Sequence, residues 1–283
     1  DPRVLKAMSP YFSKKFGNTM SLHSLGQEAK TALEESRQGI ADLIGAKAEE
    51  IIFTGSATES NNLALKGVAL ARRSSKSEGG FAGHIIISSI EHDCVLESAK
   101  WLETQGFEIT KLPVDKYGLI NPLDVKKAIK AETILVSIIH ASNEIGTIQD
   151  LTAIGKVCRE KGVYFHTDAS QSFGKVAIDV NKMNIDLLTA NSRKMYGPPG
   201  AGLLFVRKGV KITPLLHGGG HESGLRSSTV NMPSIVGFAT AVKIAQKEMV
   251  KDARRETKLR DKLIRNILKI PGTHLNGHPE KRL

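Results

Sequence analysis

The chain has 283 residues, with 40 lysines and arginines against 29 aspartates and glutamates, and a formal net charge of +11 at pH 7. Hydrophobic residues make up 40% of the sequence and charged residues 24%, so a large core can be buried and a wholly disordered chain is excluded. No segment approaches the roughly 20 apolar residues that cross a membrane. The two cysteines are too few for a disulfide scaffold, and we expect a cytoplasmic protein.

The basic residues are spread along the chain and are densest in 251–269, where they alternate with apolar residues. This pattern is typical of the exposed face of an amphipathic helix. A nucleic-acid site is the alternative, but the sequence contains no zinc finger and no aromatic-bearing RNA-binding strand. We therefore expect a solvated basic surface and no nucleic-acid partner.

Stretches with helical periodicity alternate with short apolar runs along most of the chain. In chain order, the predicted helices are 27–43, 59–72, 94–104, 122–130, 151–161 and 234–270, the last as one helix or two. The predicted strands are 51–54, 84–88, 107–112, 134–138, 164–167, 187–190 and 202–206. A stretch rich in serine and glycine, 74–83, is expected to be a surface loop. This alternation predicts an α/β fold with a mostly parallel central sheet flanked by helices.

Polar residues follow several predicted strands, at the edge where α/β folds bind their ligands. The turn Gly55-Ser56-Ala57-Thr58 comes after the strand 51–54 and opens a helix. Backbone N–H groups and the helix dipole suit such a turn to a phosphate. An ordinary hydroxyl N-cap explains the same residues.

Asp168 and Lys194 follow two further strands. A carboxylate at the end of a buried strand is costly unless it is paired. Either a protonated pyridine nitrogen or the start of the next helix would pair Asp168. Lys194 can form a Schiff base if neighbouring cations such as Arg193 lower its pKa, and the alternative is a solvated lysine.

His92 and Asn143 lie beyond two other predicted strands. A single histidine is more often a hydrogen-bonded structural residue than a catalyst, and the histidines lack the spacing of metal ligands. A phosphate turn, an imidazole, an amide, a carboxylate and a lysine at one sheet edge nevertheless fit pyridoxal phosphate. This cofactor needs an anion cradle, an acid at its ring nitrogen, a donor to its phenolic oxygen and a lysine for its aldehyde.

Longer sequence motifs surround these candidate residues and point to a particular family. They are Phe-Gly-Asn (16–18), Ser-Leu-His-Ser-Leu-Gly (21–26), Ala-Thr-Glu-Ser-Asn-Asn (57–62), Glu-His (91–92), Asn-Glu-Ile-Gly-Thr-Ile-Gln (143–149), His-Thr-Asp-Ala (166–169), Tyr-Gly-Pro (196–198) and Gly-Gly-Gly-His-Glu (218–222). With these motifs, the sequence resembles the cysteine desulfurases of the NifS/IscS type, in the class V branch of the fold-type I pyridoxal-phosphate enzymes.

The resemblance implies a role for each candidate residue. Lys194 would bind the cofactor aldehyde and move protons, Asp168 would keep the ring nitrogen protonated, and His92 would stack on the ring as an acid or base. Asn143 and Gln171 would address the side of the phenolic oxygen.

The resemblance also implies a phosphate cradle and a homodimer. The residues that would hold the phosphate within one subunit are Ala57, Thr58, Ser192 and Arg193. Thr229 would reach the phosphate of the neighbouring subunit.

The domains implied are a cofactor-binding large domain, 1–242, and the incomplete start of a small α/β domain, 243–283.

The reaction implied is removal of sulfur from L-cysteine, which gives L-alanine and a persulfide for an iron–sulfur scaffold or another sulfur acceptor. The family's nucleophilic cysteine would lie beyond Leu283, so Cys94 and Cys158 are both expected to be structural. The alternatives are another class V activity, such as a selenocysteine lyase or an aminotransferase, and a non-catalytic partner protein that binds the cofactor.

Overall fold

A single sheet forms the centre of the molecule. The computed structural model describes residues 1–72 and 82–283, and the loop predicted over 74–83 lies almost entirely outside them. Within the described residues, seven strands pair in the order β1-β7-β6-β5-β4-β2-β3. They are β1 (Ile51–Thr54), β2 (Gly83–Ser88), β3 (Phe107–Leu112), β4 (Thr133–Ser137), β5 (Tyr164–Asp168), β6 (Leu187–Asn191) and β7 (Gly202–Val206).

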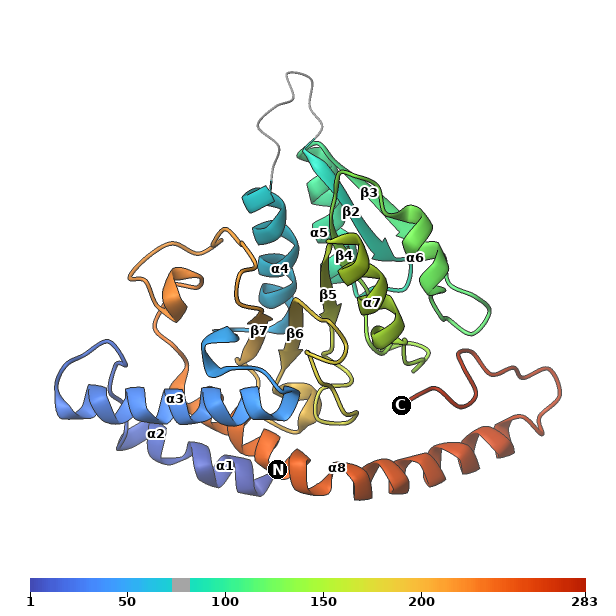
Figure 1. Cartoon of the computed structure of the whole chain (residues 1–283). Helices are drawn as coiled ribbons and strands as arrows, with labels where there is room; N and C mark the ends of the chain where they lie inside the picture. Colours follow the sequence, from blue (N-terminus) through green and yellow to red (C-terminus); the bar gives the residue numbers. More distant parts are fainter. Residues whose placement is uncertain (73–81) are drawn as a thin grey trace.

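The direction of the strands confirms the predicted mostly parallel sheet. Neighbours from β6 to β3 are parallel, whereas β7 is antiparallel to both β6 and β1. Because β1 and β6 both oppose β7, they point the same way. The carboxyl ends of β1, β2, β4, β5 and β6 therefore meet at one edge of the sheet (Figure 1).

Helices cover both faces of this sheet. They are α1 (Pro2–Met8), α2 (Pro10–Ser13), α3 (Ser24–Ile44), α4 (Ala57–Arg72), α5 (Asp93–Thr104), α6 (Pro122–Ala128), α7 (Leu151–Lys161) and α8 (Met232–Ile267), with short 3-10 turns η1 (Ala48–Glu50), η2 (Arg193–Met195) and η3 (Glu222–Gly224). In the described part of the chain, no helix combines the length and hydropathy that a membrane crossing needs.

Two apolar clusters fill the space between the sheet and the helices. Ile85 and Ile87 of β2 pack with α4 and α5, and Ile86 packs on the opposite face with α3, α7 and α8. Successive side chains of a strand point to opposite faces, so a strand buried on both sides needs consecutive apolar residues. This is why the isoleucine run at 85–87 forms an internal strand.

The C-terminal helix is unbroken, one of the two forms that the sequence allowed. Helix α8 begins two residues before the predicted segment 234–270 and ends at Ile267, and the predicted domain boundary at 242–243 falls inside it. Phe238 and Val242 in its first half are buried, whereas Leu259 and Leu263 in its second half are exposed. Figure 1 shows this second half extending beyond the sheet. The division into 1–242 and 243–283 stays a prediction.

The last residues return from α8 to the loop after β4. The N–H of His278 donates to Thr147 Oγ1 at 2.9 Å, and the N–H of Leu283 donates to the Gly146 carbonyl at 3.0 Å. The N–H of Ile148 completes the contact by donating to the Lys281 carbonyl at 2.9 Å. The tail thus pairs with part of the 143–149 motif.

Candidate cofactor site

The start of α4 forms a capped helix N-terminus at the strand edge. Ser56 Oγ accepts from the Glu59 N–H at 3.2 Å, and Glu59 Oε2 accepts from the Gly55 N–H at 2.8 Å. The serine is therefore the N-cap that the sequence allowed. The first backbone bond of the turn runs from the Ser60 N–H to the Ser56 carbonyl. The N–H groups of Ala57 and Thr58 come before it and remain available for an anion.

Asp168 is the last residue of β5, and its side chain is almost fully enclosed. The residue is 3% exposed, Oδ1 accepts from the Ser170 N–H at 2.8 Å, and Oδ2 accepts from Asn61 Nδ2 at 2.7 Å. Across the described residues no lysine or arginine forms an ion pair with it. A buried carboxylate without a cation is costly, so this donor set fits the protonated ring nitrogen of pyridoxal phosphate.

His92 is the N-cap of α5, and its imidazole is exposed at the same edge. Its Nδ1 accepts from the Cys94 N–H at 3.2 Å and lies 3.1 Å from Cys94 Sγ. Since a backbone N–H can only donate, Nδ1 must be the acceptor, and this assigns the ring proton to Nε2. Nε2–H is the polar group that His92 offers to a ligand.

Glu91 anchors the loop that carries His92. Its Oε1 accepts from Ser88 Oγ at 2.6 Å and from the Ile139 N–H at 2.7 Å, which ties the ends of β2 and β4 together. Burial raises the pKa of this carboxyl to about 8, against the lowering effect of both hydrogen bonds. The sequence identified Glu91 only as the neighbour of His92 and missed this anchoring role.

Two further histidines near the sheet edge, His140 and His166, are buried. His166 lies between Ser137 Oγ at 2.8 Å and Thr189 Oγ1 at 3.2 Å. Burial lowers the pKa of His166 to about 3 and that of His140 to about 4. Both imidazoles are therefore neutral at pH 7.

Lys194 lies in η2, directly after β6, and is exposed. Its N–H donates to Asn191 Oδ1 at 3.1 Å. The turn continues through Tyr196, whose φ of 64° is in the left-handed region. A Cβ at Gly197 would lie 2.9 Å from the Ser192 Cβ, so the turn requires glycine there.

The other residues predicted for the phosphate have different surroundings. The Ser192 hydroxyl is buried and donates to the Pro198 carbonyl inside its own loop. Arg193 is exposed beside Lys194, and Thr229 is exposed in the segment before α8. Ala57 and Thr58 are thus the predicted phosphate ligands whose backbone donors remain available.

Asn143 and Gln171 follow β4 and β5, as the strand pattern predicted. Asn143 is exposed, and its Nδ2 donates to Glu144 Oε1 at 2.7 Å. Gln171 is half-buried beyond Asp168. Their contact with a phenolic oxygen stays a prediction.

Sequence reasoning missed the role of Asn61 and did not include Cys94 among the candidate site residues. Asn61 Nδ2 contacts both Asp168 Oδ2 and, at 3.1 Å, Cys94 Sγ. Cys158 is fully buried in the core, as expected of a structural cysteine. Cys94 instead lies among the candidate site residues. Two signals in the sequence could have placed these residues in the site. Cys94 comes two residues after His92, and Asn61 comes one helical turn after the phosphate turn.

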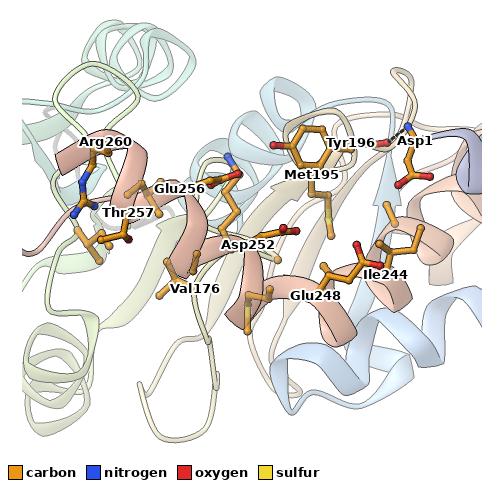
Figure 2. A pocket seen from close by; sticks show the side chains of 18 of the residues that line it. Asp1, Val176, Met195, Tyr196, Ile244, Glu248, Asp252, Glu256, Thr257 and Arg260 are labelled. Atoms are coloured by element: carbon orange, nitrogen blue, oxygen red, sulfur yellow. Dashed lines mark hydrogen bonds between the residues drawn. The ribbon is translucent and has the colours of Figure 1, made fainter. Parts of the chain in front are cut away.

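A separate cavity of about 490 Å³ lies between α8 and the turn after Lys194. Figure 2 shows Asp252 and Glu256 of α8 on one side of it and Met195 and Tyr196 on the other. The residues predicted to bind the cofactor do not line this cavity. The candidate site is therefore the polar edge of the sheet. The cavity is separate from it, although Met195 and Tyr196, which line the cavity, directly follow Lys194 in the sequence.

Comparison with known proteins gives matches along the whole chain. Residues 1–283 match the family model described as Aminotransferase class-V. The cysteine desulfurase IscS of Methanosarcina thermophila is 50% identical over 280 residues, which are 99% of this chain and 68% of that protein.

Two solved structures have the same fold. One described as a NifS-like protein has a TM-score of 0.93 and 38% identity, and the match covers 100% of this chain and 76% of that one. One described as SspA in complex with cysteine has a TM-score of 0.82 and 43% identity, and the match covers 90% of this chain and 74% of that one.

Proposed function

This chain belongs to the aminotransferase class-V family, and on that premise we propose that it is a cysteine desulfurase that takes sulfur from L-cysteine with pyridoxal phosphate. Relatives of this activity match it along its whole length. The observation that carries the proposal is Asp168, a buried carboxylate at a strand end that has amide donors and, among the described residues, no cation.

The cofactor, when bound, draws electrons away from the bonds to the substrate Cα. Asp168 would hold the proton on the ring nitrogen, and the N–H groups of Ala57 and Thr58 would bind the phosphate. The Lys194 amine would hold the aldehyde and then carry the proton of the substrate Cα. His92 would present Nε2–H to the ring side.

The sulfur leaves the substrate by transfer to a thiolate, which must be ionised when it attacks. Burial raises the pKa of Cys94 to about 11 and that of Cys158 to about 12. Both are protonated at neutral pH and unsuited to this role. The products would be L-alanine and a persulfide on another cysteine, from which an iron–sulfur scaffold or another acceptor protein takes the sulfur.

We further propose a homodimer in which Thr229 reaches the phosphate of the second subunit. Thr229 is exposed in the segment before α8. Its exposure supports a role toward a second subunit. The cytoplasmic location stays a prediction.

The assignment of Lys194 can be tested by reduction of the cofactor-loaded protein with borohydride. We expect the reduced cofactor on the peptide that contains Lys194, and loss of both this adduct and the visible absorbance in Lys194→Ala. Lys182→Ala, at an exposed lysine outside the site, is the matched control. An adduct on a different lysine would contradict the assignment.

The activity is tested by supplying L-cysteine and a small thiol as sulfur acceptor, with alanine and sulfide measured. Equal yields of both support a desulfurase. Faster turnover of L-selenocysteine would indicate a selenocysteine lyase, and consumption of L-cysteine without sulfide would indicate an aminotransferase. If the chain binds the cofactor but turns over none of these substrates, the result would favour the alternative of a non-catalytic partner protein.

A further inference from the structure

A chain of hydrogen bonds connects the two side chains, Asp168 and His92, that would contact the ring of the cofactor. It runs from Asp168 on β5 through Asn61 on α4 and Cys94 on α5 to His92. We propose that Asn61 and Cys94 are positioning residues that hold Asp168 and His92 in one array and keep His92 in its Nε2–H form. This inference rests on the proposed cofactor site.

Asn61 is fixed by the chemistry of its partners. The side chain is 0% exposed, and Nδ2 donates to Asp168 Oδ2 at 2.7 Å and to Cys94 Sγ at 3.1 Å. An ionised carboxylate only accepts, so the amide must turn its NH₂ group toward Asp168. Both N–H groups are then used, one on each partner.

The same orientation leaves Asn61 Oδ1 buried with no partner among the described residues. An unsatisfied buried acceptor destabilises the fold. The amide keeps this orientation because the alternative would place its oxygen against the carboxylate. Asn61 thus orients Asp168 through Nδ2, while its own Oδ1 is left without a hydrogen bond among the described residues.

Cys94 continues the array to the imidazole. Its backbone N–H donates to His92 Nδ1 at 3.2 Å, so the thiol, 3.1 Å from the same nitrogen, can only be a second donor. The raised pKa of the thiol, due mainly to burial, keeps that proton in place at neutral pH. Cys94 Sγ therefore accepts from Asn61 and donates to His92.

The array restricts what His92 can do. With Nδ1 occupied by the backbone N–H and the thiol of Cys94, the polar hydrogen of the imidazole lies on Nε2. The array thus directs Nε2–H of His92 toward a bound group.

The first test uses the cofactor-free protein. Long-range ¹H–¹⁵N correlation spectra of histidine-labelled chain report the tautomer of each imidazole, and His92→Gln assigns the signal. We expect the Nε2–H form for His92. A proton on Nδ1 would overturn the array, and this result is independent of whether the chain binds pyridoxal phosphate.

The second test compares Cys94→Ala with Cys94→Ser, measuring the dissociation constant of pyridoxal phosphate by absorbance titration. Loss of one hydrogen bond should weaken binding roughly five-fold in Cys94→Ala, and the serine hydroxyl should restore it. Asn61→Ala, which removes a donor from a charged group, should weaken binding more, by roughly ten-fold or above. Cys158→Ala is the matched control for removal of a thiol elsewhere.

The outcomes separate this inference from the proposed function. Equal effects of Cys94→Ala and Cys158→Ala, or failure of serine to restore binding, would overturn the positioning role. Wild-type protein that does not bind pyridoxal phosphate would instead contradict the proposed function, while the histidine spectra would still decide the array. Thermal unfolding of each variant identifies any that fail to fold.

Discussion

Glu91 combines complete burial with a carboxyl group whose second oxygen has no partner in the described structure. Burial raises its pKa from 4.5 to about 8, so the folded protein holds this proton at pH 7 while the unfolded chain does not. The stability linked to this proton is complete at low pH and is lost as the pH rises toward the folded value.

Glu91→Gln should remove this pH dependence. The amide keeps an acceptor for the Ile139 N–H, and it cannot ionise. Between about pH 5 and about pH 8 the free energy of unfolding of the wild type should fall by up to about 1.4 kcal/mol per pH unit more than that of Glu91→Gln. Urea denaturation across this range measures the difference.

The exposed Glu103 on α5 supplies a control, because Glu103→Gln changes the same charge without a buried site. Parallel pH profiles for the wild type and Glu91→Gln would show that Glu91 is ionised in the folded protein.

Among the elements, α3 is joined to β1 and η3 by a buried ion pair. Arg37 NH1 lies 2.7 Å from Glu222 Oε2, and NH2 lies 2.9 Å from Oε1. Glu222 Oε2 also accepts from the Phe53 N–H at 2.7 Å, and Arg37 donates to the Ile51 carbonyl. This pair explains why the 218–222 motif ends in glutamate.

Removal of Glu222 should leave the buried Arg37 paired only with Glu34, a half-exposed partner 3.1 Å away that solvent screens. We expect Glu222→Ala to lower the free energy of unfolding by about 3–5 kcal/mol, and the double variant with Arg37→Ala to cost clearly less than the sum of the two single variants. A double-mutant cycle measured by urea denaturation gives the coupling.

The exposed pair Lys15–Glu28, also 2.7 Å apart, is the comparison. Its coupling should stay below about 1 kcal/mol, since solvent screens it. Equal coupling energies for the two pairs would contradict the importance of burial.

The sequence predicts an element well when the pattern that specifies it is local, and poorly when the element or contact depends on residues far apart in the chain. The strand bounds agree because runs such as Ile85–Ile87 must be buried on both faces. Helices α1 and α2, with 7 and 4 residues, are too short to show periodicity and were missed. In the site, Asp168 was predicted from its strand end, whereas its contact with Asn61 joins residues 107 positions apart. No local pattern carries such a contact.

For the whole molecule, the N-terminal 25 residues carry a set of exposed large apolar side chains. Its members are Leu5, Phe12, Phe16, Met20, Leu22 and Leu25, with Leu22 90% exposed. Where exposed apolar side chains gather on a surface, they mark protein–protein contacts. A second copy of the chain is the partner that fits the proposed homodimer.

We expect the wild type to sediment as a dimer and Leu22→Glu to shift it toward the monomer at micromolar concentration. Leu259→Glu changes an exposed leucine on the far half of α8 and should leave the dimer intact. A monomeric wild type, or a dimer that Leu259→Glu dissociates and Leu22→Glu does not, would exclude this N-terminal segment as the contact.

The antiparallel strand β7 has a consequence for the order in which the protein is built on the ribosome. It is inserted between β1 and β6, and Thr54 of β1 pairs with Gly202. A nascent chain that has emerged only as far as β6 has β1 without a neighbour and β6 with an open edge. Such edges invite pairing with other chains. Closure of the sheet must therefore await synthesis of residues 202–206, which makes this short strand the late step in biosynthetic folding.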